Sequence, residues 1–234
     1  MKELFRYGRC LLLLIPIIAG CQHLATRPDS AGCLSALLPE NRQAVVVSST
    51  AGGDGQKVEL ALFNKTERGW EQAFPAFAGS AGRNGLAPIG GKREGDGRTP
   101  SGIFSLKRGF GYAPLETKVK YIVLTDDLIW VDDPTSPYYN TLVSRKEVVP
   151  GSFETMRRRD DLYRYGMVIE YNTDPVIPGL GSAIFFHIWR GPNAPTAGCV
   201  AMSQENMLKL LHWLDPARKP VAVIGPEAAC SAFP

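Results

Sequence analysis

The pattern of apolar and polar positions along the chain predicts a protein built mostly from short strands. The segments "AVVVSS" (44–49) and "KVELALF" (57–63) are typical of two strands joined by a glycine-rich connection, and "GWEQAFPAFAG" (69–79) adds a third candidate. Short runs rich in β-branched and aromatic residues follow in "YIVLT", "IWVDD", "MVIEYN" and "SAIFFHIW". Near the end of the chain, "PVAVIG" predicts a last strand.

Two other segments show the pattern of an amphipathic helix. "SFETMRRRDDLYRYG" (152–166) follows Pro150 and predicts a first helix, with Ser152 as its N-cap. "SQENMLKLLHWLDP" (203–216) predicts a second, capped by Ser203 and ended by Pro216. Strands outnumber helices, and we find neither a regular βαβ alternation nor an internal repeat. The predicted class is therefore α+β and β-rich, a single domain with a mostly β core and a few short helices.

The first twenty residues have the form of an export signal. "MKELFRYGRC" carries three basic side chains and one acidic one, and the apolar run "LLLLIPIIAG" is about half of the ~20 residues that a membrane-spanning helix needs. Without residues 1–20 the formal net charge falls from +3 to +1. A charge so close to zero gives no electrostatic reason to expect a nucleic-acid partner.

Residues 18–21, "IAGC", resemble the lipobox of bacterial lipoproteins, in which the peptide is cut before the cysteine and the cysteine receives lipid. The resemblance implies that Cys21 is lipidated and holds the protein to a membrane. Because Gln22 rather than an aspartate follows, it also implies a periplasmic location at the outer membrane. The alternative is an ordinary secretory signal with an incidental Cys21. The predicted organisation is a lipoprotein signal peptide (1–20), a tether (21–42), a folded domain (43–226) and a C-terminal tail (227–234).

Export to an oxidising compartment changes the interpretation of the remaining cysteines. With Cys10 removed and Cys21 lipidated, three are left, so at most one disulfide forms. Cys33 and Cys230 lie near the two chain ends, which are often close together in a single domain, and we expect these two to pair. Cys199 then remains a free thiol. The alternative is that neither Cys33 nor Cys230 is bridged.

Several catalytic and binding sites are excluded by the rest of the sequence. Residues 79–103 form a long glycine-rich segment typical of a functional loop, but Arg93 follows Lys92, so the pattern of a phosphate-binding P-loop is absent. His23, His187 and His212 are scattered, and without a CxxC or HExxH motif the sequence predicts no metal site. Neither GxSxG nor SxxK, which serine acylation requires, occurs.

One stretch, "FFHIWRGPNAPTAGCVAMS" (185–203), combines a histidine and a cysteine. Cys199 is expected in a glycine-containing turn directly before the helix that starts at Ser203, where the helix dipole would favour a thiolate. His187, at the end of a strand, could complete an activated nucleophile, and backbone N–H groups near Gly198 could face a developing oxyanion. The alternative is a buried free cysteine and an unrelated histidine at a strand end.

The pattern H…[ST]xGCxxM, present as His187, Thr196, Gly198, Cys199 and Met202, resembles the signature of the L,D-transpeptidase catalytic domain (YkuD) family. "GDGRTPSGIF" (95–104) is similar to a second segment of that family. The resemblance covers roughly residues 43–225. It implies acyl transfer on peptidoglycan stem peptides, with Cys199 as the nucleophile that forms a thioester and His187 as the base. It also implies that Gly198 and Thr196 contact the oxyanion or substrate, and that no metal or organic cofactor is required.

The sequence departs from the family pattern around these residues. The spacing from His187 to Cys199 is twelve residues, shorter than the common pattern, and Ala197 and Ala201 stand where many relatives have polar side chains. We expect Arg190 to replace a lost carboxylate-binding residue. The departures leave open a carboxypeptidase or amidase that uses the same cysteine and histidine, as well as a wall-binding lipoprotein without turnover. We further expect a monomer.

Overall fold

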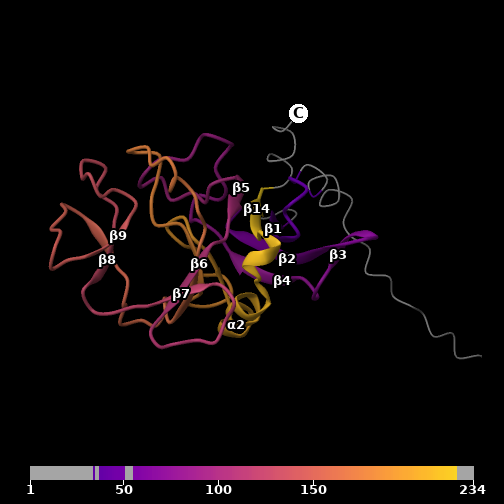
Figure 1. Ribbon diagram of the computed structural model, residues 1–234. Helices are drawn as coiled ribbons and strands as arrows, with labels where there is room; N and C mark the ends of the chain where they lie inside the picture. Colours follow the sequence, from indigo (N-terminus) through magenta and orange to yellow (C-terminus); the bar gives the residue numbers. More distant parts are fainter. Residues whose placement is uncertain (1–33, 35–36, 51–54, 226–234) are drawn as a thin grey trace, which may run out of the picture.

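The computed structural model describes residues 34, 37–50 and 55–225, and Figure 1 shows their arrangement along the chain. The predicted signal peptide, the lipidation of Cys21 and the pairing of Cys33 with Cys230 lie outside the described residues and stay predictions. None of the helices in the described part of the chain is long and apolar enough to cross a membrane.

A large sheet dominates the described residues, with eleven strands. Its order is β5 (Gly102–Ser105), β14 (Val221–Ile224), β1 (Gln43–Ser49), β2 (Lys57–Thr66), β4 (Phe77–Ser80), β13 (Val200–Met202), β12 (Phe185–Ile188), β11 (Tyr165–Val168), β6 (Arg108–Gly111) and β7 (Lys120–Val123), with β3 (Gly69–Gln72) paired to β2. A smaller sheet contains β10 (Phe153–Thr155), β8 (Leu128–Val131) and β9 (Leu142–Ser144). The mostly β architecture agrees with the predicted class.

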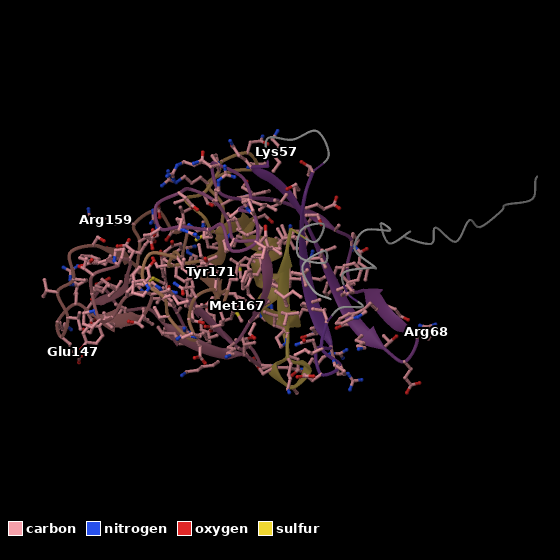
Figure 2. The ribbon with its side chains drawn as sticks, turned by 90° about the horizontal axis from the view of Figure 1, so that it is seen from above. Lys57, Arg68, Glu147, Arg159, Met167 and Tyr171 are labelled. Carbon is pink, nitrogen blue, oxygen red and sulfur yellow. The ribbon has the colours of Figure 1, made fainter. Side chains whose placement is uncertain are left out.

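The smaller sheet and β3 lie at opposite ends of the molecule. In Figure 1 the strands β8 and β9 are on the far side of the large sheet from β3. Figure 2 shows the same separation, with Glu147 and Arg159 at one end, Arg68 at the other and Met167 between them. Between these ends lies the largest core cluster, which includes residues of β1, β2, β11, β12, β13, α2 and β14.

Strand β1 is buried on both faces, which explains its continuous apolar sequence. Val45 and Val47 belong to one core cluster, while Ala44 and Val46 belong to another on the opposite side of the sheet. Successive side chains of a strand point to opposite faces, so an uninterrupted valine run suits a strand that is covered on both sides. Leu34 packs in the second of these clusters and is 2% exposed, so core packing extends N-terminal to Gln43.

The second predicted helix is confirmed as α2 (Gln204–Trp213). The Ser203 side chain accepts a hydrogen bond from the backbone N–H of Asn206, as expected of an N-cap. Its apolar face buries Met207, Leu210 and Leu211 in the largest core cluster, and α2 packs against β11 and β12. A short 3₁₀ helix (Pro216–Arg218) follows.

The first predicted helix, over residues 152–166, is wrong. Phe153–Thr155 forms β10, which pairs antiparallel with β8 at Val131, Trp130 and Ile129. A turn follows in which Asp161 has a positive φ of 58°, a backbone conformation that a right-handed helix cannot include. Strand pairing with a distant segment thus overrides a local pattern of apolar and charged residues. This correction matters because the segment lines the site described below.

Strands β12 and β13 bring the two predicted catalytic residues together. They pair in parallel, with Phe186 opposite Val200 and His187 opposite Ala201. Cys199 lies two residues before Ala201, so the alternation of side chains places it on the same face of the sheet as His187. A twelve-residue separation in sequence becomes proximity across two neighbouring strands.

Candidate active site

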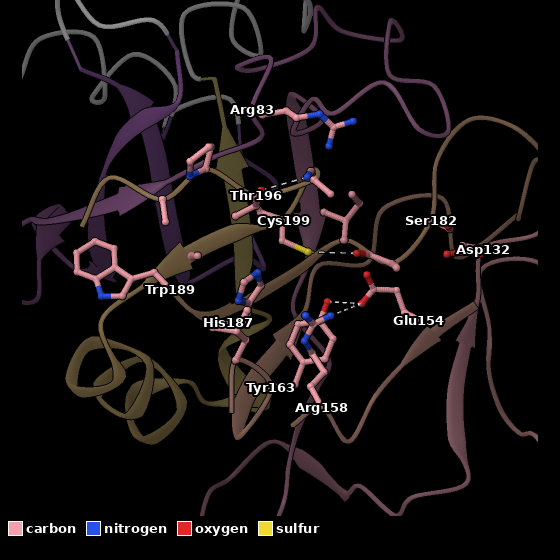
Figure 3. Close-up of a pocket in the computed structure, with 18 of the residues that line it drawn as sticks. Arg83, Asp132, Glu154, Arg158, Tyr163, Ser182, His187, Trp189, Thr196 and Cys199 are labelled. Carbon is pink, nitrogen blue, oxygen red and sulfur yellow. Dashed lines mark hydrogen bonds and ion pairs between the residues drawn. The ribbon is translucent and has the colours of Figure 1, made fainter. Parts of the chain in front are cut away.

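Cys199 and His187 line one cavity of about 490 Å³. The cavity is bounded by the 79–103 segment, through Arg83 and Glu94, and by the connection that leads from β12 to β13. Figure 3 shows the two side chains facing this space, with Tyr163, Glu154 and Arg158 beside them. Cys199 is 8% exposed and His187 is 6% exposed, so both reacting groups lie at the cavity floor rather than on the surface.

The backbone around Cys199 is fixed by hydroxyl groups. Thr196 Oγ1 accepts a hydrogen bond from the Gly198 N–H at 3.1 Å and donates one to the Cys199 carbonyl at 2.6 Å. Thr99 Oγ1, from the glycine-rich segment, donates to the same carbonyl at 3.3 Å. A Cβ at Gly198 would lie 3.0 Å from the Arg98 carbonyl oxygen, so only glycine leaves this loop unchanged.

The Cys199 thiol has a defined partner. Its Sγ donates a hydrogen bond to the Ala183 carbonyl, with the sulfur and oxygen 3.2 Å apart. Ala183 has a left-handed backbone with a φ of 53°, a conformation that costs a non-glycine residue roughly 1–2 kcal/mol. Such strain is common where a backbone group must occupy a particular place in a site. The carbonyl can only accept, so this contact favours the protonated thiol.

A single tautomer of His187 fits its contacts. The ring atom Nδ1 lies 2.8 Å from the Ile188 carbonyl oxygen, and because a carbonyl can only accept, Nδ1 carries the hydrogen. Nε2 is then left with a lone pair. Burial lowers the pKa of His187 from its ordinary 6.5 to about 4, so the ring is neutral at physiological pH. A neutral imidazole with an available Nε2 is suited to act as a general base.

Burial also keeps Cys199 neutral. Burial, as the largest cause, and the nearby Glu154 carboxylate together raise the pKa of the thiol from its ordinary 9.0 to about 12. The expectation that the helix dipole favours a thiolate is wrong, because β13 (Val200–Met202) separates Cys199 from the first turn of α2. The dipole acts only within about one turn. The resting site therefore contains a neutral thiol and a neutral imidazole.

A network of charged side chains follows the cavity floor. Tyr163 donates a hydrogen bond to Glu154 at 2.5 Å, and Arg158 lies 3.7 Å from the same carboxylate. Arg158 directs two hydrogen bonds, of 2.8 and 2.7 Å, to Asp160. Asp160 also accepts a longer contact from Arg190 at 3.3 Å. These groups lower the pKa of Asp160 to about 2, with Arg158 as the largest cause.

The 79–103 segment forms a well-bonded wall of the cavity. Glu94 accepts hydrogen bonds from Tyr139 at 2.5 Å and from Ser182 at 2.6 Å. The Lys92 ammonium, whose side chain is only 4% exposed, lies 2.7 Å from the carboxylate of Asp96. Both carboxylates therefore hold the segment in place, Glu94 by joining it to the residues that precede β12.

Comparison with known proteins identifies the family. Residues 64–223 match the family model described as the YkuD L,D-transpeptidase catalytic domain. The chain belongs to this family. No curated protein matches the chain.

Among solved structures, the chain is similar to the helical cell shape determining protein Pgp2 from Campylobacter jejuni. The two share 14% sequence identity with a TM-score of 0.40 over 84% of this chain and 54% of that chain. This chain thus spans about half the length of the solved relative.

Within this L,D-transpeptidase domain, the predicted site residues all line the cavity but differ in their exposure and contacts. Cys199, His187, Thr196, Gly198 and Arg190 all line the cavity. The Gly198 N–H is donated to Thr196, so its hydrogen already has a partner. Arg190 lies at the rim with its side chain 67% exposed, and one nitrogen of its guanidinium contacts Asp160 at 3.3 Å. Of the aromatic residues of the cavity region, Trp189 lines it, whereas Tyr139 is buried against Glu94.

Sequence reasoning missed the polar residues opposite His187. Glu154, Arg158 and Tyr163 fall in the segment predicted as a helix, where they resemble a solvated face. Asp132 also lines the cavity, at the end of β8. Local pattern could not have found them, because strand pairing between distant segments brings them to the cysteine. As for metals, the described residues contain no group of three or more His, Cys, Asp or Glu side chains that could hold an ion.

Proposed function

We propose that this protein is a peptidoglycan-modifying cysteine acyltransferase, an L,D-transpeptidase that acts on the stem tetrapeptide. The observation that carries the proposal is the buried pair within a domain of that family: Cys199 as a neutral thiol and His187 as a neutral imidazole with Nε2 unprotonated, in one cavity. This pairing of nucleophile and base is the minimum that acyl transfer through a thioester requires.

The chemistry follows from the protonation states. As Sγ of Cys199 attacks the carbonyl carbon of the acyl donor, its proton passes to Nε2 of His187. The C–N bond then breaks, and the protonated His187 gives the proton to the departing amine of D-alanine. An amine of a second stem then attacks the thioester carbonyl, and His187 accepts a proton from this amine. The C–S bond breaks, and the protonated His187 returns the proton to Sγ of Cys199. His187 thus returns to its starting state after each half of the reaction.

The place of action is part of the proposal. We propose that residues 1–20 are removed as a lipoprotein signal peptide and that lipid on Cys21 anchors the protein at the outer membrane, facing the periplasm. The supporting features are the short apolar run and the "IAGC" segment. Replacing Cys21 by Ser should release the mature protein from the membrane fraction or leave it unprocessed. A membrane fraction identical to that of the parent would contradict the anchor.

Product analysis separates transfer from hydrolysis. Purified protein is incubated with a disaccharide tetrapeptide, and the products are resolved by chromatography and mass spectrometry. We expect cross-linked dimers that are absent with Cys199→Ala. Shortened monomers alone would mean that water, not an amine, opens the thioester, as in a carboxypeptidase. Free stem peptides would mean an amidase. The absence of any product from folded protein would favour a wall-binding role.

A further inference from the structure

Tyr163 is held rigidly beside the nucleophile. It lies just before β11 and is 4% exposed. Its ring packs edge-on against Phe110, Phe185 and His187, with ring centroids 5.7, 5.7 and 5.3 Å apart. Aromatic contacts on several sides leave the ring little freedom, so the position of its hydroxyl group is set by the fold.

The hydroxyl group of Tyr163 is hydrogen-bonded to a carboxylate in the cavity that Cys199 also lines. It donates to Glu154 Oε2 at 2.5 Å, and Tyr163 packs in the same core cluster and lines the same cavity as Cys199. Figure 3 shows Tyr163 close to Glu154, below Cys199. Arg158 directs its hydrogen bonds to Asp160, which leaves Glu154 with a looser ion pair of 3.7 Å. Tyr163 is therefore a main partner of Glu154.

When Cys199 loses its thiol proton, its sulfur changes from a hydrogen-bond donor to an acceptor. The resting thiol donates to the Ala183 carbonyl, and that oxygen cannot stabilise a sulfur that has lost its hydrogen. A sulfur that becomes negatively charged in a buried site requires donors instead. The hydroxyl group of Tyr163, a residue of the same packed cluster and the same cavity as Cys199, is one such donor. Burial raises the pKa of Tyr163 well above its ordinary value of 10, so its own proton stays in place.

We propose that Tyr163 is a further catalytic residue, whose hydroxyl group donates a hydrogen bond to Sγ of Cys199 as the thiol proton moves to His187, and that Glu154 is the positioning residue that controls this hydroxyl group. The inference depends on Cys199 being the nucleophile of the proposed function. No proton leaves Tyr163 at any step. When Glu154 is ionised, the hydroxyl hydrogen points to the carboxylate. When Glu154 is protonated, it donates to the phenol oxygen, and the hydroxyl hydrogen turns to the sulfur.

The test measures the reactivity of Cys199 without any wall substrate. The full-length protein is alkylated with iodoacetamide at pH 7, and the rate is followed on the Cys199 peptide by mass spectrometry. Tyr163→Phe keeps the ring and removes the donor, so the rate should fall about tenfold, the effect of a hydrogen bond to a charged group. Tyr171→Phe, which removes a hydroxyl group bonded to Leu180 instead, is the matched control and should leave the rate unchanged.

The double variant separates the hydrogen bond from simple charge. Glu154→Gln resembles the protonated carboxyl, because its amide can donate to the phenol oxygen, and should speed alkylation. If the Glu154→Gln substitution acts through Tyr163, adding Tyr163→Phe should abolish the increase in the alkylation rate. If the gain persists in the double variant, the Glu154 charge alone is responsible and the inference is wrong. An unchanged rate in folded Tyr163→Phe would also overturn it.

The pH dependence of the alkylation rate tests the inference even if the Tyr163→Phe variant folds poorly. Besides Tyr163 and Glu154, the cavity that Cys199 lines contains the neutral His187 on β12. It also contains the charged or titratable side chains of Arg83, Lys92, Glu94, Asp132, Arg158 and Arg190. These groups are present in both wild type and Glu154→Gln, so a difference between the two proteins in how the alkylation rate depends on pH reports the Glu154 carboxyl group. Identical pH dependences would contradict the inference. If the protein forms no product from wall peptides but the alkylation rates of Cys199 change as expected in the variants, only the proposed function is rejected. If the protein cross-links wall peptides but Tyr163→Phe is alkylated at the wild-type rate, only the inference about Tyr163 is rejected.

Discussion

Burial keeps both reacting side chains of the site uncharged at neutral pH. The pKa of His187 is lowered to about 4 and that of Cys199 is raised to about 12, in each case chiefly because the charged form is poorly solvated. The family resemblance predicts Cys199 as the nucleophile, and this stays a prediction; the protonation state of the thiol could not be predicted from the sequence. A sequence shows that a helix follows, and it does not show the intervening strand or the depth of burial.

The first prediction concerns stability against pH. Unfolding returns His187 to its ordinary pKa of 6.5, so between pH 6.5 and 4 the unfolded chain binds a proton that the folded protein does not. The contribution of His187 is fully present above pH 6.5 and is lost as the pH falls toward 4, by about 3 kcal/mol. Chemical denaturation at pH 7 and pH 4 should show a smaller difference for His187→Gln than for wild type. The exposed His212→Gln should behave like wild type, and equal losses in all three proteins would contradict the prediction.

The second prediction concerns the hydroxyl group of Thr196. Thr196→Val removes both of its hydrogen bonds, to Gly198 and to the Cys199 carbonyl, and leaves two buried backbone groups without that partner. We expect a loss of roughly 2 kcal/mol in unfolding free energy, together with slower acylation of Cys199. Thr196→Ser keeps the hydroxyl group and should retain most of both. A valine variant with wild-type thermal stability and acylation would show that the hydroxyl group is dispensable.

At the scale of elements, local pattern predicted some segments well and others not. The strands at β1, β2, β12 and β14 and the helix α2 could be predicted because their own apolar periodicity matches their burial. The helix expected over 152–166 failed because Phe153–Thr155 pairs with β8, a partner at a distance in sequence. Long-range pairing leaves no mark in a local window, which is why Glu154 and Tyr163 were missed.

The third prediction concerns the wall formed by the 79–103 segment. Burial alone would raise the pKa of Asp96, but hydrogen bonds from Lys92 and from the backbone of Arg93 and Arg98 outweigh it and lower the pKa. Asp96→Asn leaves the buried Lys92 ammonium without its counter-charge and should cost roughly 3 kcal/mol of unfolding free energy at pH 7. Because the folded pKa is lowered, this contribution should fade as the pH drops below the ordinary 3.8.

The matched control for that variant is Asp126→Asn. Asp126 is 94% exposed and forms an ion pair with Arg157 at 3.4 Å. Ion pairs between exposed side chains contribute little, so the expected change is below about 1 kcal/mol. Urea denaturation of the three proteins checks the difference. Equal stabilities of the two variants would show that the Lys92–Asp96 contact is not needed to hold the wall.

At the scale of the whole molecule, one sheet joins the first and last strands of the described residues to the site. Strands β1 and β14 pair in parallel, and Leu34 and Val223 share a core cluster. Several strands further along the same sheet, β12 and β13 carry His187 and align it with the residues after Cys199. The family resemblance implied that Cys199 and His187 belong to one site, whereas composition and periodicity alone left this undecided.

The fourth prediction concerns the disulfide between Cys33 and Cys230. Both cysteines lie outside the described residues. Leu34, the residue after Cys33 in the sequence, shares a core cluster with Val221 and Val223 of the last strand. A bridge closing so long a loop is expected to stabilise the fold by up to ~5 kcal/mol. Thiol titration of the mature protein under denaturing, non-reducing conditions should find one free thiol, on Cys199. Three free thiols would exclude the bridge.

The most direct test of the central claim is to trap the acyl-enzyme. The protein is incubated with a carbapenem, an acylating compound, and the mass of the Cys199 peptide is measured. We predict an adduct on Cys199 in wild type, none in Cys199→Ala, and much slower formation in His187→Gln, because the neutral imidazole must take the thiol proton. A folded wild-type protein whose Cys199 stays unmodified, or an adduct that forms equally fast without His187, would contradict the account.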